Sequence, residues 1–124
     1  MSITLNQISD ITFPTRKTES WKYTPLNELL STEFIPGEKT AIPTQVMEKY
    51  LIPGLEVNRV VFVNGEYEPT LSEIKDVGIE VRKKQSERKN DDDSFPLLNS
   101  LYTGMEVRIV LKEGSRFLHP IHIL

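Results

Sequence analysis

Cysteine is absent from the 124 residues of this chain, and long apolar runs are absent with it. Without cysteine there is no disulfide, no thiolate nucleophile and no metal or cluster site built from cysteine alone. No run approaches the ~18 apolar residues of a membrane span. The first residues, MSITLNQISDITF, also lack the basic flank and apolar block of a signal peptide. We therefore expect a soluble, unexported protein of the cytoplasm with no membrane association.

A strong charge of either sign is also lacking. The chain carries 15 basic and 18 acidic residues, a net charge of -3, and its 38% hydrophobic and 27% charged content is that of an ordinary globular protein. This balance gives no electrostatic reason to expect nucleic acid as a partner. The length predicts one domain that buries roughly two thirds of its unfolded surface, which is enough for a modest core.

One stretch, from Phe13 to Leu30, concentrates most of the informative residues. It reads FPTRKTESWKYTPLNELL and holds the only tryptophan. Thr24 followed by Pro25 is typical of a helix start, because a threonine hydroxyl can accept from first-turn amides and proline loses no hydrogen bond there. Leucines follow at i, i+3 and i+4 spacing, at Leu26, Leu29 and Leu30. We predict a helix from about Pro25 to Ser31.

Upstream of that helix, charged and aromatic side chains are interleaved. They are Arg16, Lys17, Glu19, Trp21, Lys22 and Tyr23. Rings set among basic groups could stack single-stranded nucleic acid, but Glu19 and the acidic total argue against that. Trp, Tyr and Arg also anchor protein interfaces, so a surface that docks a partner is a second interpretation. We favour a structural one, in which Trp21 anchors the loop to the core and Glu19 pairs with a neighbouring base.

The first half of the chain otherwise predicts short helices, loops and one hairpin. Residues 2–12 fit a short helix better than a strand, residues 32–42 predict a turn and a loop, and residues 43–52 predict a second helix. The strongest strand signal is Arg59 to Val63, apolar on both faces as in a central strand. Asn64-Gly65 then predicts a type I′ turn, so a β-hairpin is expected over 59–68 until Pro69 ends the pairing.

The second half predicts two strands, a loop, a helix and an extended end. Alternating residues predict a half-buried strand over Gly78–Lys83, and KKQSERKNDDDS, over Lys83–Ser94, has no apolar residue and predicts a mobile loop. A helix over Phe95–Tyr102 and a strand over Met105–Leu111 follow. From Phe117 an apolar extended run reaches Leu124, and an unpaired apolar strand is an aggregation edge. We expect this sequence to be a fragment cut where a larger β architecture begins, and two copies to pair through this edge.

Candidate chemistry is sparse. His119 and His122 are the residues that invite a metal or acid–base hypothesis, but positions three apart on a strand point to opposite faces, so joint ligation needs a bulge. Glu66 and Glu68 are like-facing carboxylates, yet exposed hairpin strands commonly carry glutamate. The three aspartates of ERKNDDDS lack the spacing of a calcium loop. We favour structural or solvated roles for all of these, and predict no catalytic, cofactor or metal site.

Three segments carry a family resemblance. PTRKTESWKYTPLNELL, then VVFVNGEYEPTLS at Val60 to Ser72, and finally GSRFLHPIHIL occur in this order. The chain resembles the N-terminal region of the SufB/SufD family, scaffold components of the SUF iron–sulfur cluster assembly machinery. The resemblance implies an α+β domain over 1–104 and the truncated start of a right-handed parallel β-helix over 105–124. With the residue patterns it predicts short N-terminal helices, a small antiparallel or mixed sheet of three or four strands around Val60 to Val63, and a β-helix-like C-terminal segment.

The resemblance also implies a function. In this family a non-enzymatic scaffold works with SufB-like and SufC-like proteins through its full-length chain, and the iron–sulfur cluster belongs to the full complex. The family's residues for iron, sulfur and SufC lie in later regions, so none is carried onto this chain. We expect an N-terminal accessory domain that is not an enzyme. The alternatives are a self-contained interaction module that docks a partner through the Trp21 region, and a metal-dependent hydrolase that uses His119 and His122.

Overall fold

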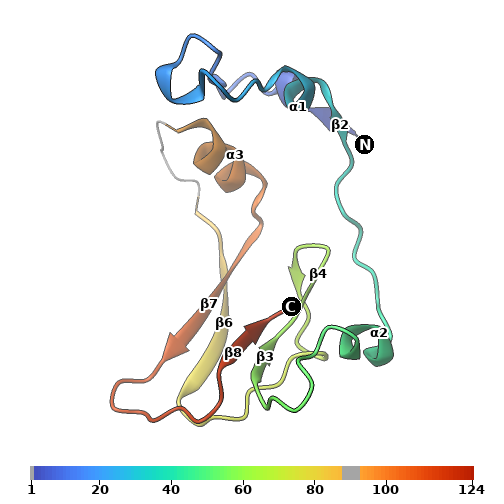
Figure 1. The fold of residues 1–124 in the computed structure, drawn as a ribbon, viewed down its shortest axis with the longest axis vertical. Coiled ribbons are helices and arrows are strands. Elements are labelled where there is room, and N and C mark those ends of the chain that lie inside the picture. The colour runs from blue at the N-terminus through green and yellow to red at the C-terminus, as the bar shows by residue number, and fades with distance from the viewer. Residues whose placement is uncertain (1, 88–92) are drawn as a thin grey trace. The chain divides into compact units, whose positions relative to one another are not determined.

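The computed structural model describes residues 2–87 and 93–124 (Figure 1). Short helices and small paired strands follow one another along the chain, so the predicted α+β class is confirmed. Of the predicted loop over Lys83–Ser94, residues 88–92 lie outside the described residues. Its two ends are not loop, because Lys83 and Lys84 continue a strand and Ser94 begins a helix. Among the described helices, none is long and apolar enough to cross a membrane.

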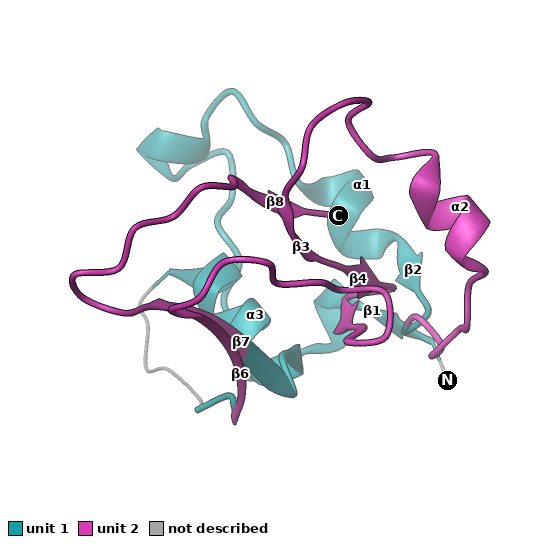
Figure 2. Cartoon of the chain, turned by 90° about the horizontal axis from the view of Figure 1, so that it is seen from below, with its two compact units in different colours: residues 1–36, 85–106 teal, residues 37–84, 107–124 magenta. Residues whose placement is uncertain are grey.

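The chain divides into two compact units, each built from two separate segments (Figure 2). Unit 1 contains residues 1–36 and 85–106, and unit 2 contains residues 37–84 and 107–124. Each unit therefore depends on contacts between residues that are distant in the sequence.

Unit 1 begins with a short strand rather than the helix predicted for residues 2–12. β1 (Ile3–Thr4) pairs antiparallel with β2 (Glu33–Phe34), and the 3₁₀ helix η1 (Leu5–Gln7) follows β1. The helix prediction was wrong because β2, a segment predicted as turn and loop, supplies a pairing partner that local periodicity does not show. Beyond η1, the chain forms a second 3₁₀ helix, η2 (Glu19–Trp21).

The two α-helices of unit 1 lie where they were predicted. α1 (Asn27–Ser31) starts two residues after Pro25, with Leu26 rather than Thr24 as its N-cap and no side-chain capping bond. Of the three leucines predicted to share an apolar face, Leu26 is buried, Leu30 is partly buried and Leu29 is exposed. α3 (Ser94–Tyr102) is capped by Asp93, whose side chain accepts a hydrogen bond from Phe95 N at 3.3 Å. This cap explains why the helix begins one residue before the predicted boundary.

Unit 2 contains the predicted hairpin. β4 (Phe62–Val63) pairs antiparallel with β5 (Glu66–Tyr67) across Asn64-Gly65. Both turn residues have positive φ, 50° at Asn64 and 81° at Gly65, so the type I′ prediction is confirmed. The helix expected over 43–52 is shorter than predicted, because α2 spans only Thr44–Glu48. β6 (Ile79–Gln85) and β7 (Met105–Leu111) pair in a two-stranded ribbon.

β3 (Asn58–Val60) forms the centre of unit 2 and has partners on both backbone edges. On one edge it pairs in parallel with β8 (Ile121–Ile123), with Val60 opposite Ile123. On the other edge Arg59 and Glu73 exchange two backbone hydrogen bonds of 2.7 and 2.9 Å. The predicted sheet of three or four strands is instead split in the described chain, because at Val61 the backbone changes partner: its carbonyl accepts from Glu68 N and its N–H donates to Ser72 Oγ.

The core of unit 2 lies on the Val61 face of this strand. Val61, Met47 and Leu71 form the buried cluster. The partly buried side chains packed against it are Ile42, Leu51, Val63 and Leu124. The strand is therefore covered as a central strand should be, which is why it carried the strongest apolar signal.

Candidate functional site

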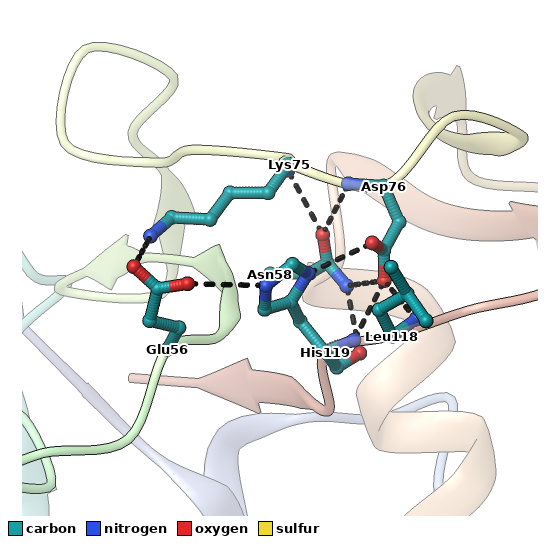
Figure 3. Close-up of polar contacts among 6 residues, drawn as sticks. All are labelled: Glu56, Asn58, Lys75, Asp76, Leu118 and His119. Atoms are coloured by element: carbon teal, nitrogen blue, oxygen red, sulfur yellow. Dashed lines mark hydrogen bonds and ion pairs between the residues drawn. The ribbon is translucent and has the colours of Figure 1, made fainter.

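Three loops meet where β3 and β8 begin, and they bring together a set of polar groups (Figure 3). We call this set the Asp76–His119 network. Its members are Glu56, Asn58, Lys75, Asp76, Leu118 and His119. They come from the start of β3, the loop before β6 and the loop before β8. All six belong to unit 2.

Asn58 is the fully buried centre of the network, with 0% of its surface exposed. Its amide Nδ2 donates to Asp76 Oδ2 at 3.0 Å and to the His119 carbonyl at 2.8 Å. Its Oδ1 accepts from the backbone N–H groups of Lys75, at 2.9 Å, and Asp76, at 3.0 Å. Every hydrogen-bonding position of this side chain is used, so Asn58 joins two loops to the start of β3.

Asp76 is a buried carboxylate with unusually many donors. Besides Asn58, Oδ2 accepts from Leu118 N at 2.9 Å and His119 N at 2.8 Å, while Oδ1 lies 2.8 Å from His119 Nδ1. The hydrogen bond from Asn58 holds the pKa of Asp76 well below its usual range, and the donors on His119 and Leu118 act in the same direction against the effect of burial. Asp76 is therefore ionised at every physiological pH.

His119 bridges two carboxylates. Because ionised Asp76 can only accept, the ring donates from Nδ1 to Asp76, which leaves Nε2 facing Glu56 Oε2 at 3.3 Å. The hydrogen bond to Asp76 raises the pKa of the imidazole above its ordinary value of 6.5, burial opposes this, and the charges of Asp76 and Glu56 reinforce it. Glu56 also pairs with Lys75 Nζ at 3.4 Å. The Lys75 charge, followed by the His119 bond, lowers the pKa of Glu56.

His119 is held by polar contacts at both ring nitrogens. Nδ1 lies 2.8 Å from Asp76 Oδ1, and Nε2 lies 3.3 Å from Glu56 Oε2. Across the described residues, no group of three or more His, Cys, Asp or Glu side chains could hold a metal ion. His122 lies on β8 opposite Arg59, and its Nδ1 is buried without a hydrogen-bond partner in the described part of the chain. The two histidines are therefore not brought together on one site.

A surface pocket of about 420 Å³ lies beside the network, and Glu56 and Lys75 belong to its wall. Its other charged residues, Arg59 and Glu73, face one another at 3.7 Å, and the Arg59 Nε donates to the Leu71 carbonyl at 2.8 Å. The four charged residues of this pocket wall thus form two ion pairs, Arg59 with Glu73 and Lys75 with Glu56.

The residues of the Trp21 stretch belong to unit 1, whereas the network belongs to unit 2. Trp21 is half-buried and stacks on Phe95, with ring centroids 5.3 Å apart and an interplanar angle of 29°. Phe13 meets the same Phe95 ring edge-on at 5.7 Å. Trp21 therefore contacts a residue of α3 that is far away in the sequence.

The neighbours of Trp21 are exposed. Arg16, Lys17, Glu19, Lys22 and Tyr23 all face solvent, and Lys22 Nζ lies 5.4 Å from the centre of the Tyr23 ring. In the described ranges Glu19 has no ion-pair partner, so the predicted pairing with a base is not found there. Elsewhere, Glu68 accepts from the N–H and hydroxyl of Thr70, which lowers its pKa and shows it stabilising a turn.

The sequence reasoning missed Glu56, Asn58 and Asp76. A usable signal was present at Asn58, which lies next to the apolar run Val60–Val63 and follows Val57. A polar side chain at the start of a buried strand needs hydrogen-bond partners inside the protein. Which partners it finds depends on the tertiary structure, since His119 lies 61 residues away.

Comparison with known proteins gives one consistent result. The iron–sulfur cluster assembly protein SufD of Escherichia coli (strain K12) is 31% identical over 125 residues, covering 97% of this chain and 29% of that protein. An iron–sulfur cluster assembly SufBD family protein of Synechocystis sp. is 29% identical over 70 residues, covering 56% of this chain and 16% of that protein. The chain thus spans less than a third of the length of these relatives. No family model matches it. The family resemblance seen in the sequence is confirmed by these two alignments.

Proposed function

We propose, on the premise that this chain is a SufD-like relative of the SufBD family, that it acts in iron–sulfur cluster assembly. One observation carries the proposal: the identity of 31% to a SufD protein extends along 97% of the chain. Because the chain corresponds to only 29% of that relative, the proposal concerns the role of one part of a larger assembly protein.

Within such an assembly we assign this part an accessory, non-catalytic role. The side chains of the Asp76–His119 network form hydrogen bonds that join three loops of the chain. These bonds support a structural role for the residues of the network. The cluster and the contacts with SufB-like and SufC-like proteins would then belong to the full complex. We also propose that two copies of this chain pair through β8, because the second edge of β8 carries no strand among the described residues.

A chimera tests this role. In Escherichia coli SufD the aligned segment is replaced by this chain, and the chimera is produced in a strain whose growth requires SufD. We expect growth and cluster content within about threefold of the native protein, whereas an unrelated α+β domain of equal length in the same place should fail, because the junctions and partner surfaces would be lost.

Two results would contradict the proposal. A soluble, folded chimera that performs no better than the unrelated domain would remove the functional equivalence. A stoichiometric visible chromophore on the isolated chain after anaerobic reconstitution with iron and sulfide would show that this part holds a cluster itself. Far-ultraviolet circular dichroism of the purified chimera separates failure to function from failure to fold.

A second candidate function is the docking of a protein partner through the Trp21 stretch. The observation that favours it is the exposure of Tyr23, at 87%, beside Lys22 and near Arg16 and Lys17. Exposed tyrosine and arginine are over-represented at the centres of protein interfaces. This module could serve an assembly protein or act independently of one.

Trp21→Ala and Tyr23→Ala distinguish the two roles. Loss of the Trp21–Phe95 stack is expected to lower the free energy of unfolding by about 2 kcal/mol, whereas loss of the exposed Tyr23 ring should change it by less than about 0.5 kcal/mol. Thermal melts measure both, and the chimera carrying each change measures function. If Tyr23→Ala keeps stability but loses complex formation, docking is supported; if Trp21→Ala leaves the melt unchanged, the packing role is wrong.

A further inference from the structure

β8 lies against β3 along a short parallel ladder and is held at both of its ends. The strand itself is three residues long, with Ile121, His122 and Ile123 opposite Asn58, Arg59 and Val60. At the start of the strand Asn58 N donates to Pro120 O at 2.8 Å. At its end Leu124 N donates to Val60 O at 2.9 Å, Leu124 O accepts from Phe62 N at 2.8 Å, and the Leu124 side chain packs against the core cluster. Ile123 remains 60% exposed. So short a parallel pair gains little from its own ladder and needs an anchor.

The Asp76–His119 network is that anchor. Leu118 and His119, which precede Pro120 and the strand, donate their backbone N–H groups to the Asp76 carboxylate, and the His119 carbonyl accepts from Asn58. The His119 ring adds a bond to Asp76 on one side and an ion pair with Glu56 on the other. Five interactions therefore fix these two residues. The Nδ1–H bond to Asp76 is present in the neutral ring as well, so the second ring proton adds the positive charge beside Asp76 and the Nε2–H ion pair with Glu56.

We infer that the network is a proton-controlled latch, in which protonated His119 fastens β8 to β3 through Asp76 and Glu56, and loss of the proton loosens the strand. Within residues 2–87 and 93–124, the charged groups in contact around the ring come from two segments. Asp76 and Lys75 come from the loop before β6, and Glu56 comes from the segment before β3, where it is shared between His119 and Lys75. This inference does not rest on the proposed function.

The direction of the effect follows from linkage. The folded chain raises the pKa of His119 above 6.5, the value to which the ring returns when β8 detaches. The ring therefore stabilises the closed strand fully below pH 6.5, and this contribution is lost as pH rises through the higher pKa of the folded state. Asp76 has the opposite sign: its pKa is lowered from 3.8, so its contribution is lost when pH falls below that value. The latch is firmest between about pH 4 and pH 6.5.

Two measurements on the same 124-residue protein test the latch. Carbon–proton NMR of the imidazole ring gives the pKa of His119 directly. Amide hydrogen exchange, corrected for the intrinsic rate at each pH, gives the opening of β8 from Leu124 N–H and Asn58 N–H. The Glu68 N–H, which donates to Val61 O in the hairpin, is the internal reference. Between pH 5.5 and pH 9 we expect β8 opening to increase about tenfold for each unit by which the folded pKa exceeds 6.5, with no matching change at Glu68.

Three variants make the test specific. His119→Asn places an amide donor near the position of Nδ1, so it keeps the Asp76 bond and cannot titrate; its β8 opening should not vary with pH over this range. Glu56→Gln should lower the pKa of the His119 ring. The increase in β8 opening between pH 5.5 and pH 9 should then become smaller in proportion to the fall in that pKa. His122→Asn, on the same strand, should leave the pH dependence unchanged.

Two outcomes would overturn the latch. One is a His119 pKa at or below 6.5 in the folded protein. The other is β8 opening that follows pH equally in the native chain and in His119→Asn. If His119→Asn folds poorly, the Glu56→Gln arm decides the question alone, because Glu56 is an exposed side chain whose replacement leaves the Asp76 bonds in place.

Discussion

Replacing Asn58 by alanine is expected to lower the free energy of unfolding by about 3 to 5 kcal/mol, measured by urea denaturation at pH 6. The change removes the partner of three backbone groups that are buried or partly buried: the N–H of Lys75, the N–H of Asp76 and the carbonyl of His119. It also opens a void beside Val60, which is fully buried. Unsatisfied buried groups account for most of the expected loss.

Asn58→Asp keeps the shape of the side chain and sharpens the experiment. A carboxylate at this position would replace a donor that lies 3.0 Å from Asp76 Oδ2, so two negative charges would share one buried site. We expect this variant to be less stable than Asn58→Ala at pH 7 and to recover part of the difference near pH 4, where the pair holds a proton.

Asn27→Ala is the matched control, because Asn27 is exposed at the start of α1. It should change the unfolding free energy by less than about 0.5 kcal/mol. If Asn58→Ala behaves like this control, the buried network does not stabilise the fold as assigned. The same result would contradict the latch, because Asn58 holds Asp76 and the His119 carbonyl in place.

Gly78→Ala is expected to cost about 2 to 4 kcal/mol. Gly78 has φ of 95°, a conformation that side chains disfavour, and an added Cβ would lie 2.9 Å from Ser115 Cβ and closer still to Ser115 Oγ. Gly78 lies at the end of the β6–β7 ribbon, where its carbonyl accepts a hydrogen bond from Lys112 N at 2.8 Å. This bond holds the two backbone segments close together. Strain in the backbone and overlap with Ser115 therefore act together, and thermal denaturation would measure their sum.

A second substitution separates the two causes. In Gly78→Ala combined with Ser115→Gly, the overlap is removed while the φ strain stays, so we expect about half of the loss to return. Gly104→Ala is the control, because its added Cβ would meet nothing within 4 Å and its φ is not positive. A Gly78→Ala protein as stable as Gly104→Ala would show that the end of the β6–β7 ribbon is not packed as described.

Elements whose cause is local were predictable from the sequence. Asn64-Gly65 adopts the positive φ values that its turn type requires, and the helix predicted over Phe95–Tyr102 is present as α3 (Ser94–Tyr102). Helix and turn signals of this kind act over a few residues, so the chain carries them complete. The family could also be identified from the sequence, since short segments in a fixed order carried the resemblance.

The candidate site could not be predicted in this way. His119 was singled out as a candidate metal ligand or acid–base group, but its actual neighbours, Asp76 and Glu56, lie 43 and 63 residues away. Nothing in the spacing of a lone histidine says which carboxylates will face it. The strand pairs were missed for the same reason: β1 finds β2, and β3 finds β8, through contacts that no local pattern records.

By itself, then, the sequence determined the class of fold, the hairpin, the positions of α1 and α3, and the family. Those properties depend on periodicity, turn chemistry and residue order, each expressed within a short stretch. The tertiary structure alone decided that Trp21 stacks on Phe95, that β8 runs parallel to β3, and that Asn58 and Asp76 bind the loop at His119. The physical reason is that a buried polar group or an open strand edge must be satisfied, but the partner that satisfies it is selected by the folding of the whole chain.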